Sequence, residues 1–141
     1  MAPFTIEVDP SPADADVKVL NQGLDGHAFA QGGIAPPAPL AVFLYDDGGR
    51  IVGGVYARVW DGILDISLLW VHEDYRGEGY GGRLMEAVEA EGVRRGCARA
   101  ELRTFDFQAP AFYRKLGYEE FYVSQDFPRG HSRYYFRKQL G

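Results

Sequence analysis

The spacing of apolar and polar residues predicts a chain built mainly of short strands. In seven segments the two kinds of residue alternate or form short apolar runs of strand length. We expect strands at 4–8, 40–45, 51–60, 63–71, 98–103, 118–124 and 133–137. The pair Asp61-Gly62 is typical of a type I′ hairpin, and a second turn is expected from Asp46 to Gly49. The strands between residues 40 and 71 are therefore expected to form an antiparallel meander.

Apolar residues that recur every three to four positions predict helices between these strands. The strongest pattern covers about 79–95, and a shorter one covers 108–116. One face of the helix at 79–95 carries only apolar or small residues, namely Gly81, Leu84, Met85, Val88 and Gly92. A weaker pattern covers 14–30, where we expect Gly23 and Gly26 to break the helix into two short pieces, because glycine lowers helix propensity.

The predicted order of elements is β-α-β-β-β-α-β-α-β-β, which places the chain in the α/β (α+β) class. A meander followed by β-α-β-α-β favours a mixed sheet with helices on its faces. The 141 residues are expected to form one domain, residues 1–141, that buries about two thirds of its unfolded surface. Hydrophobic residues make up 46% and charged residues 25%, close to the average of globular proteins.

Charge and cysteine content narrow the kinds of partner. The net charge is −5 and no basic cluster is longer than Arg94-Arg95, so we expect no nucleic-acid partner. An acidic surface instead favours a cationic substrate or simply solubility. Cys97 is the only cysteine, which excludes an internal disulfide and suggests a buried thiol. No segment approaches the roughly 18 apolar residues of a membrane span, and residues 1–9 lack a signal-peptide pattern, so we expect a cytoplasmic protein with no membrane partner.

A glycine-rich loop joins the strand at 63–71 to the helix at 79–95. The loop consists of Arg76, Gly77, Glu78, Gly79, Tyr80, Gly81 and Gly82. Glycine permits positive φ angles and a close approach of the backbone to a ligand. Backbone N–H groups at the start of a helix bind phosphate, so the loop predicts a seat for a phosphate or pyrophosphate.

Two cofactor motifs fit this loop. Gly77 to Gly82 match G-x-G-x-x-G of dinucleotide-binding folds, with Glu101 about 20 residues further on. The surrounding sequence argues against a dinucleotide-binding fold, because the five residues 72–76 separate the strand from the glycines. The strand also belongs to a series of hairpins rather than to a βαβ unit. The other motif is R-x-x-G-x-G, formed by Arg76, Gly79 and Gly81.

With the second motif the chain resembles the GNAT superfamily of N-acetyltransferases. It looks like a small, single-domain bacterial-type member of a subgroup loosely described as related to histone acetyltransferases. The resemblance runs from about residue 40 to the end and includes F-Y-x-K-x-G-Y at 112–118. It implies a mostly antiparallel sheet of six to seven strands flanked by three to four helices. The parallel strands 64–71 and 98–103 would splay apart, with a bulge near Leu69-Trp70.

The resemblance also implies a reaction. An acetyl group would pass from acetyl-CoA to a small primary amine or a lysine by direct attack in a ternary complex, with no metal. The residues that match the family's coenzyme A site are Leu69, Trp70, Val71, Arg76, Gly77, Glu78, Gly79, Tyr80, Gly81, Gly82 and Tyr113. Tyr113 matches the tyrosine that protonates the departing thiolate, and a phenol with a pKa near 10 suits that role.

The general base is less clearly marked. Asp65 aligns with the glutamate base of the histone-acetylating branch, and strand alternation places it on one face with Ser67 and Leu69. Glu101 and His131 are lesser candidates, and ordered water is an alternative relay. The sequence does not name the acceptor, and a homodimer stays open. A non-catalytic acyl-CoA-binding sensor or interaction module with the same fold is the alternative function.

Overall fold

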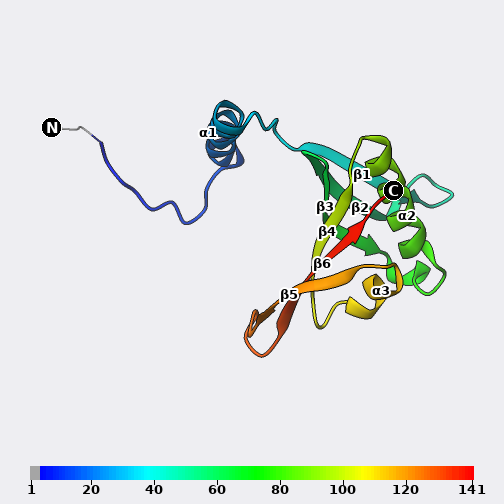
Figure 1. Cartoon of the computed structure of the whole chain (residues 1–141). Coiled ribbons are helices and arrows are strands. Elements are labelled where there is room, and N and C mark those ends of the chain that lie inside the picture. The colour runs from blue at the N-terminus through cyan, green and yellow to red at the C-terminus, as the bar shows by residue number, and fades with distance from the viewer. Residues whose placement is uncertain (1–3) are drawn as a thin grey trace. The chain divides into compact units, whose positions relative to one another are not determined.

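The computed structural model describes residues 4–141, and the chain divides between Pro36 and Pro37 into two units that are described separately (Figure 1). The first unit contains α1 (Asp14–Gly32), a single helix that ends where Gly33, at φ 69°, donates its N–H to the Phe29 carbonyl. The predicted break at Gly23 and Gly26 is wrong, because a cost of about 1 kcal/mol per glycine weakens a helix without ending it. One domain spanning 1–141 stays a prediction.

The predicted strand at residues 4–8 is also wrong, since these residues belong to no strand. Alternation alone does not make a strand, because a strand also needs a neighbour to pair with. In the described part of the chain, no helix has both the length and the apolar character that a bilayer crossing requires.

The second unit is a six-stranded mixed sheet in the order β1-β2-β3-β4-β6-β5. Its strands are β1 (Ala38–Tyr45), β2 (Ile51–Trp60), β3 (Ile63–Val71), β4 (Arg99–Phe105), β5 (Glu119–Gln125) and β6 (Ser132–Gln139). Its helices are the short 3₁₀ turn η1 (Glu73–Tyr75), α2 (Tyr80–Arg94) and α3 (Pro110–Lys115). The meander β1-β2-β3 is confirmed. Asp61 and Gly62 have φ angles of 48° and 83°, as a type I′ turn requires.

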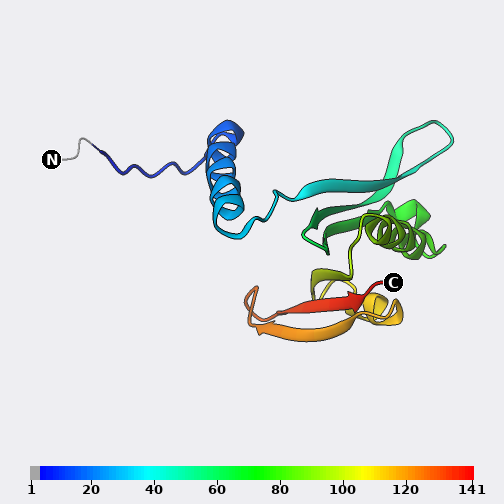
Figure 2. The ribbon, with the colours of Figure 1, turned by 45° about the horizontal axis from the view of Figure 1, so that its top comes forward.

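One face of the sheet packs against α2 and builds the core (Figures 1 and 2). The helix face predicted from the sequence is the buried one, with Leu84, Met85, Val88 and Gly92 inside. A Cβ added to Gly92 would lie 3.1 Å from a methyl carbon of Leu64, so a glycine is needed for this close approach. This close approach holds α2 against the half of the sheet that β1, β2 and β3 form.

The parallel strands β3 and β4 pair over only four residues each. Pairing runs from Ile63 opposite Arg99 to Ile66 opposite Leu102, although β3 continues to Val71 and β4 to Phe105. The two strands therefore splay apart at their C-terminal ends, which confirms the predicted splayed pair. We call this opening the fork.

A β-bulge lies beside the fork, but two residues earlier than predicted. Leu68 is opposite Tyr56 and Ile66 is opposite Ala57, so Ser67 is an extra residue in β3 rather than Leu69 or Trp70. An extra residue reverses the alternation of side chains beyond it. Ile66 before the bulge and Leu69 after it therefore both face the core.

Candidate functional site

The fork opens into a cavity of about 880 Å³. Four segments line it. They are residues 66–71 of β3, residues 75–77 and 79–82 of the loop and the start of α2, residues 102–104 of β4, and residues 108, 109, 112 and 113 at and before α3. Because β3 and β4 no longer pair here, backbone N–H and C=O groups that face the gap lack a partner strand. The cavity thus combines apolar walls with free strand edges.

Both faces of the sheet contribute to this cavity. Leu69 and Val71 of β3 lie on the face that packs on the helices, and Tyr113 of α3 packs against the same core. Trp70 and Arg103 alternate with core-facing neighbours and lie on the opposite face. Side chains from both faces of the sheet therefore line the cavity at the fork.

The glycine loop forms one end of the cavity. Gly77 and Gly79 have φ angles of 79° and 85°, in the left-handed region that favours glycine, and a Cβ at either would point into open space. Gly79 is the N-cap of α2 and has no side chain to satisfy the first N–H groups of that helix. Arg76 fixes the loop by donating from Nε to the Val71 carbonyl at 2.8 Å. This arrangement suits an anion.

Tyr113 projects from α3 into the middle of the cavity wall. Its ring packs on Phe112, Tyr118 and Phe136, with centroids 5.1, 6.1 and 6.3 Å away. Burial raises the pKa of the Tyr113 phenol, which stays protonated at neutral pH. Within residues 4–141 no side chain or carbonyl accepts a hydrogen bond from its hydroxyl. The phenol is therefore a neutral donor held in place by its ring.

Tyr118, five residues further on, has a structural role instead. Its buried hydroxyl donates to Glu89 Oε2 at 2.7 Å, and Lys138 Nζ donates to Glu89 Oε1 at the same distance. Burial and this carboxylate raise the pKa of Tyr118 far above its ordinary value. The three side chains tie α2 to β6.

The predicted coenzyme A residues fall into two groups. Those that line the cavity are Leu69, Trp70, Val71, Arg76, Gly77, Gly79, Tyr80, Gly81, Gly82 and Tyr113. Glu78 is exposed and is not among the lining residues. Their roles in coenzyme A binding stay predictions.

Asp65 lies outside the cavity wall. Its carboxylate is 16% exposed and accepts from Arg58 Nη2 at 3.0 Å and from Arg103 Nη2 at 3.2 Å. The bulge at Ser67 separates it from Leu69, which turns to the other face, so the expected shared face with Leu69 is wrong. The role of Asp65 as base stays a prediction.

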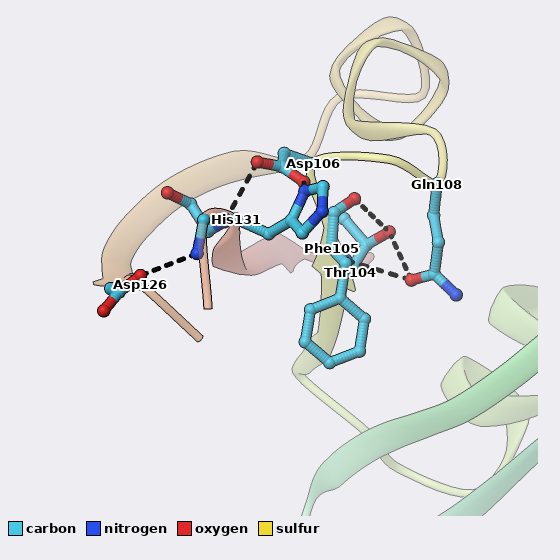
Figure 3. Close-up of polar contacts among 8 residues, drawn as sticks. Thr104, Phe105, Asp106, Gln108, Asp126 and His131 are labelled. Atoms are coloured by element: carbon cyan, nitrogen blue, oxygen red, sulfur yellow. Dashed lines mark hydrogen bonds and ion pairs between the residues drawn. The ribbon is translucent and has the colours of Figure 1, made fainter. Parts of the chain in front are cut away.

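The lesser base candidates are also bound to partners. His131 Nδ1 lies 3.0 Å from Asp106 Oδ1, and Asp106 Oδ2 accepts from the Ser132 N–H at 2.9 Å (Figure 3). This pair joins the end of β4 to the β5–β6 turn, and neither residue lines the cavity. Glu101 pairs with Arg99 at 2.8 Å. Among residues 4–141 no group of three His, Cys, Asp or Glu residues is arranged to hold a metal ion.

Two residues that line the cavity, Arg103 and Gln108, belong to none of the sequence motifs. Arg103 ends the predicted strand at 98–103, and only the early end of pairing with β3 brings it to the fork. Gln108 turns back so that its Oε1 accepts from Thr104 Oγ1 at 3.2 Å and from the Phe105 N–H at 2.9 Å (Figure 3). These bonds fix the segment between β4 and α3. The sequence offers one indication for Arg103, because this residue ends a strand that is predicted to separate from its parallel neighbour.

A splayed parallel strand pair lies beside a glycine-rich helix N-terminus, and a half-buried tyrosine lines the gap, which is the arrangement expected of a GNAT acyltransferase. The sequence model of the acetyltransferase (GNAT) domain matches residues 39–120, and the chain belongs to this family. It is similar to the blasticidin-S acetyltransferase of Streptomyces morookaense, with 35% identity over 101 residues that cover 71% of this chain and 74% of the relative. The chain is therefore an acetyltransferase.

Solved structures agree with this fold. A crystal structure of an acetyltransferase from Bacillus cereus ATCC 14579 superposes with a TM-score of 0.79 and 30% identity, covering 95% of this chain and 98% of that one. A proposed streptothricin acetyltransferase from Bacillus anthracis, in complex with acetyl coenzyme A, gives a TM-score of 0.66 at 18% identity over 74% and 64% of the two chains. GNAT acetyltransferases use acetyl-CoA as the acetyl donor.

Proposed function

We propose that this protein transfers the acetyl group of acetyl-CoA to a primary amine of a small molecule, by direct attack within a ternary complex. The observation that carries the proposal is the cavity through the fork, which is lined from both faces of the sheet. A donor that enters along the helix face and an acceptor that enters from the opposite face would meet there. The relative that acts on blasticidin S supports a small-molecule acceptor rather than a peptide.

The donor side of the proposal rests on the loop and the strand edge. Arg76 to Gly82 offer N–H groups and the positive end of α2 to the pyrophosphate of coenzyme A. The edge of β3 beyond Ile66 offers backbone partners to the amides of the pantetheine arm. A backbone N–H of β3 near the Ser67 bulge would polarise the thioester carbonyl.

The chemical step needs a neutral amine and a proton for the leaving thiolate. The amine nitrogen forms a bond to the carbonyl carbon, and the carbon–sulfur bond of the resulting tetrahedral intermediate then breaks. Tyr113 gives its phenolic proton to the departing sulfur, and the phenolate regains a proton from solvent. The proton that the amine loses passes to a base or to ordered water.

Thiol release measured with a panel of acceptors tests the proposed function. The panel contains blasticidin S, nourseothricin, streptothricin, polyamines and lysine peptides, each added to protein and acetyl-CoA. We expect acceptor-dependent thiol release with at least one small-molecule amine, and acetylated product by mass spectrometry. Tight binding of coenzyme A with no acceptor-dependent release would favour a sensor. If coenzyme A does not bind, both functions are excluded.

The variant Asp65→Asn tests whether Asp65 is the base. Loss of a general base lowers kcat by about 10²- to 10⁴-fold. Because Asp65 contacts Arg58 and Arg103 and does not line the cavity, we expect a decrease in kcat of less than about tenfold. Steady-state kinetics across pH measure this. A hundredfold loss together with a shifted acidic limb in the pH profile would instead make Asp65 the base.

A further inference from the structure

The sheet face opposite α2 is cationic next to the fork, although the whole chain carries a net charge of −5. Arg58 on β2, Arg103 on β4 and Arg133 on β6 lie on this face, and the carboxylate of Asp65 contacts the first two of them. Charged side chains on this face are otherwise paired one to one. Arg99 has Glu101 at 2.8 Å, and Arg137 has Glu119 at 3.5 Å. The excess of positive charge is therefore specific to the fork.

Asp65 holds two guanidinium groups but neutralises only one. Arg58 and Arg103 each contribute one Nη2 contact, to different oxygens of the same carboxylate. A guanidinium has five N–H donors, so most of the donors on both arginines remain for a ligand. The side chains of Arg58 and Arg103 are 43% and 32% exposed, so solvent reaches them. Asp65 thus fixes two cationic groups without using up their binding capacity.

Arg133 adds a third cation that no carboxylate neutralises within residues 4–141. Its guanidinium lies over the rings of Phe105, Phe127 and Tyr135, at 5.4, 5.8 and 5.5 Å from their centroids. In the register of β4 with β6, Arg103 lies opposite Tyr135 and Phe105 lies opposite Arg133. Arg103 and Arg133 are therefore diagonal neighbours on adjacent strands. The aromatic rings hold Arg133 on the side of the fork from which an acceptor would approach.

We propose that this arginine cluster binds an oxyanion of the acceptor, so the acceptor is an amine that also carries a carboxylate or a phosphate. The inference rests on the proposed function and names its substrate class. Arg103 is the central residue, because it alone of the three lines the cavity. Guanidinium groups bind carboxylate and phosphate with paired, charge-assisted hydrogen bonds. The net charge of −5, which favours a cationic substrate or simply solubility, does not reveal this local excess of positive charge.

The cluster also favours the reactive form of the amine. Neighbouring positive charge disfavours protonation of an amine, so an acceptor held here loses its proton more readily than it does in water. A bound carboxylate neutralises one of the two excess positive charges of the cluster, so the repulsion of the arriving amine and the lowering of its pKa are both reduced but not abolished. Binding and activation then come from the same residues, and the demand on a separate general base decreases.

Matched pairs of acceptors test the inference. The pairs are lysine and lysinamide, β-alanine and β-alaninamide, and phosphoethanolamine and ethanolamine, which differ in the anionic group. We expect wild-type protein to prefer the anionic member of at least one pair in kcat/KM. Arg103→Gln is expected to lower kcat/KM for that member about 10- to 100-fold and to lower it much less for the neutral member, so that the preference for the anionic member is lost. Arg137→Gln, on the same face but paired with Glu119, is the control and is expected to change neither.

The outcomes separate this inference from the proposed function. Equal kcat/KM for anionic and neutral members, with no effect of Arg103→Gln, would overturn the oxyanion site while acetyl transfer stands. If no pair is turned over, calorimetry with the coenzyme A-loaded protein replaces kinetics. Binding of an anionic member that Arg103→Gln abolishes then supports the site, and absence of such binding overturns it. Absence of coenzyme A binding would instead indicate failure of the proposed function.

Discussion

Replacing Tyr113 with phenylalanine is expected to lower kcat about 100-fold or more and to leave the dissociation constant of coenzyme A unchanged. A general acid contributes about 10²- to 10⁴-fold, and the ring of Tyr113 keeps its packing on Phe112 and Phe136 in the variant. Steady-state kinetics and calorimetry with coenzyme A measure the two quantities. The control is Tyr45→Phe, which removes an exposed hydroxyl of β1 outside the cavity. An unchanged kcat would remove Tyr113 as the acid.

The pH profile gives a second readout for Tyr113. An acid donates only while it is protonated, and burial raises the pKa of this phenol above its ordinary value near 10. Loss of the proton, and of the rate that depends on it, therefore occurs above about pH 10. We expect no alkaline decline of kcat from Tyr113 at lower pH. A decline centred near pH 8 that Tyr113→Phe abolishes would contradict this assignment.

The second large effect is expected for Gly79→Val, which should weaken coenzyme A binding about 10- to 100-fold. Gly79 has φ 85°, and a β-branched residue there costs of order 1–3 kcal/mol unless the loop changes conformation. A changed loop would turn the N–H groups of the α2 N-terminus away from the pyrophosphate. Calorimetry with coenzyme A measures the loss.

Gly49→Val is the matched control for that variant. Gly49 has φ 79° and open space at its Cβ position, as Gly79 does, but lies in the β1–β2 turn and does not line the cavity. Both variants should lower the melting temperature by similar amounts, because they carry similar backbone strain. Only Gly79→Val should lose coenzyme A affinity. If Gly79→Val binds coenzyme A as tightly as Gly49→Val does, the glycine loop is excluded as the pyrophosphate site.

Local patterns predicted much of the sheet and its main helix. Asp61-Gly62 specifies the hairpin through its two positive φ angles, and the apolar face of 79–95 becomes the buried face of α2. Both signals are local in the chain, so they can be recognised without knowing the partners. Residues 4–8 alternate between apolar and polar side chains but form no strand. Whether a neighbouring strand is present to pair with them cannot be recognised from a local pattern.

The site was harder to predict because it depends on where pairing stops. The splay of β3 and β4 follows from the family resemblance, but its exact start at Ile66 and Leu102 decides that Arg103 reaches the cavity. The position of the bulge likewise results from the register between β2 and β3, not from a residue type that marks Ser67. Neither the arginine cluster nor its contact with Asp65 could be seen before those registers were known.

The extra residue at Ser67 has a practical consequence for altering the acceptor range. A mutagenesis library that follows simple alternation along β3 from Asp65 would target Ser67 and Leu69, and so would damage the core at Leu69. A library that shifts phase at the bulge would vary Leu68 and Trp70, together with Arg103 on β4, and would leave the packed side untouched. A shift of one residue in the positions chosen for mutation thus decides whether a library alters the acceptor side of the cavity or disrupts the core.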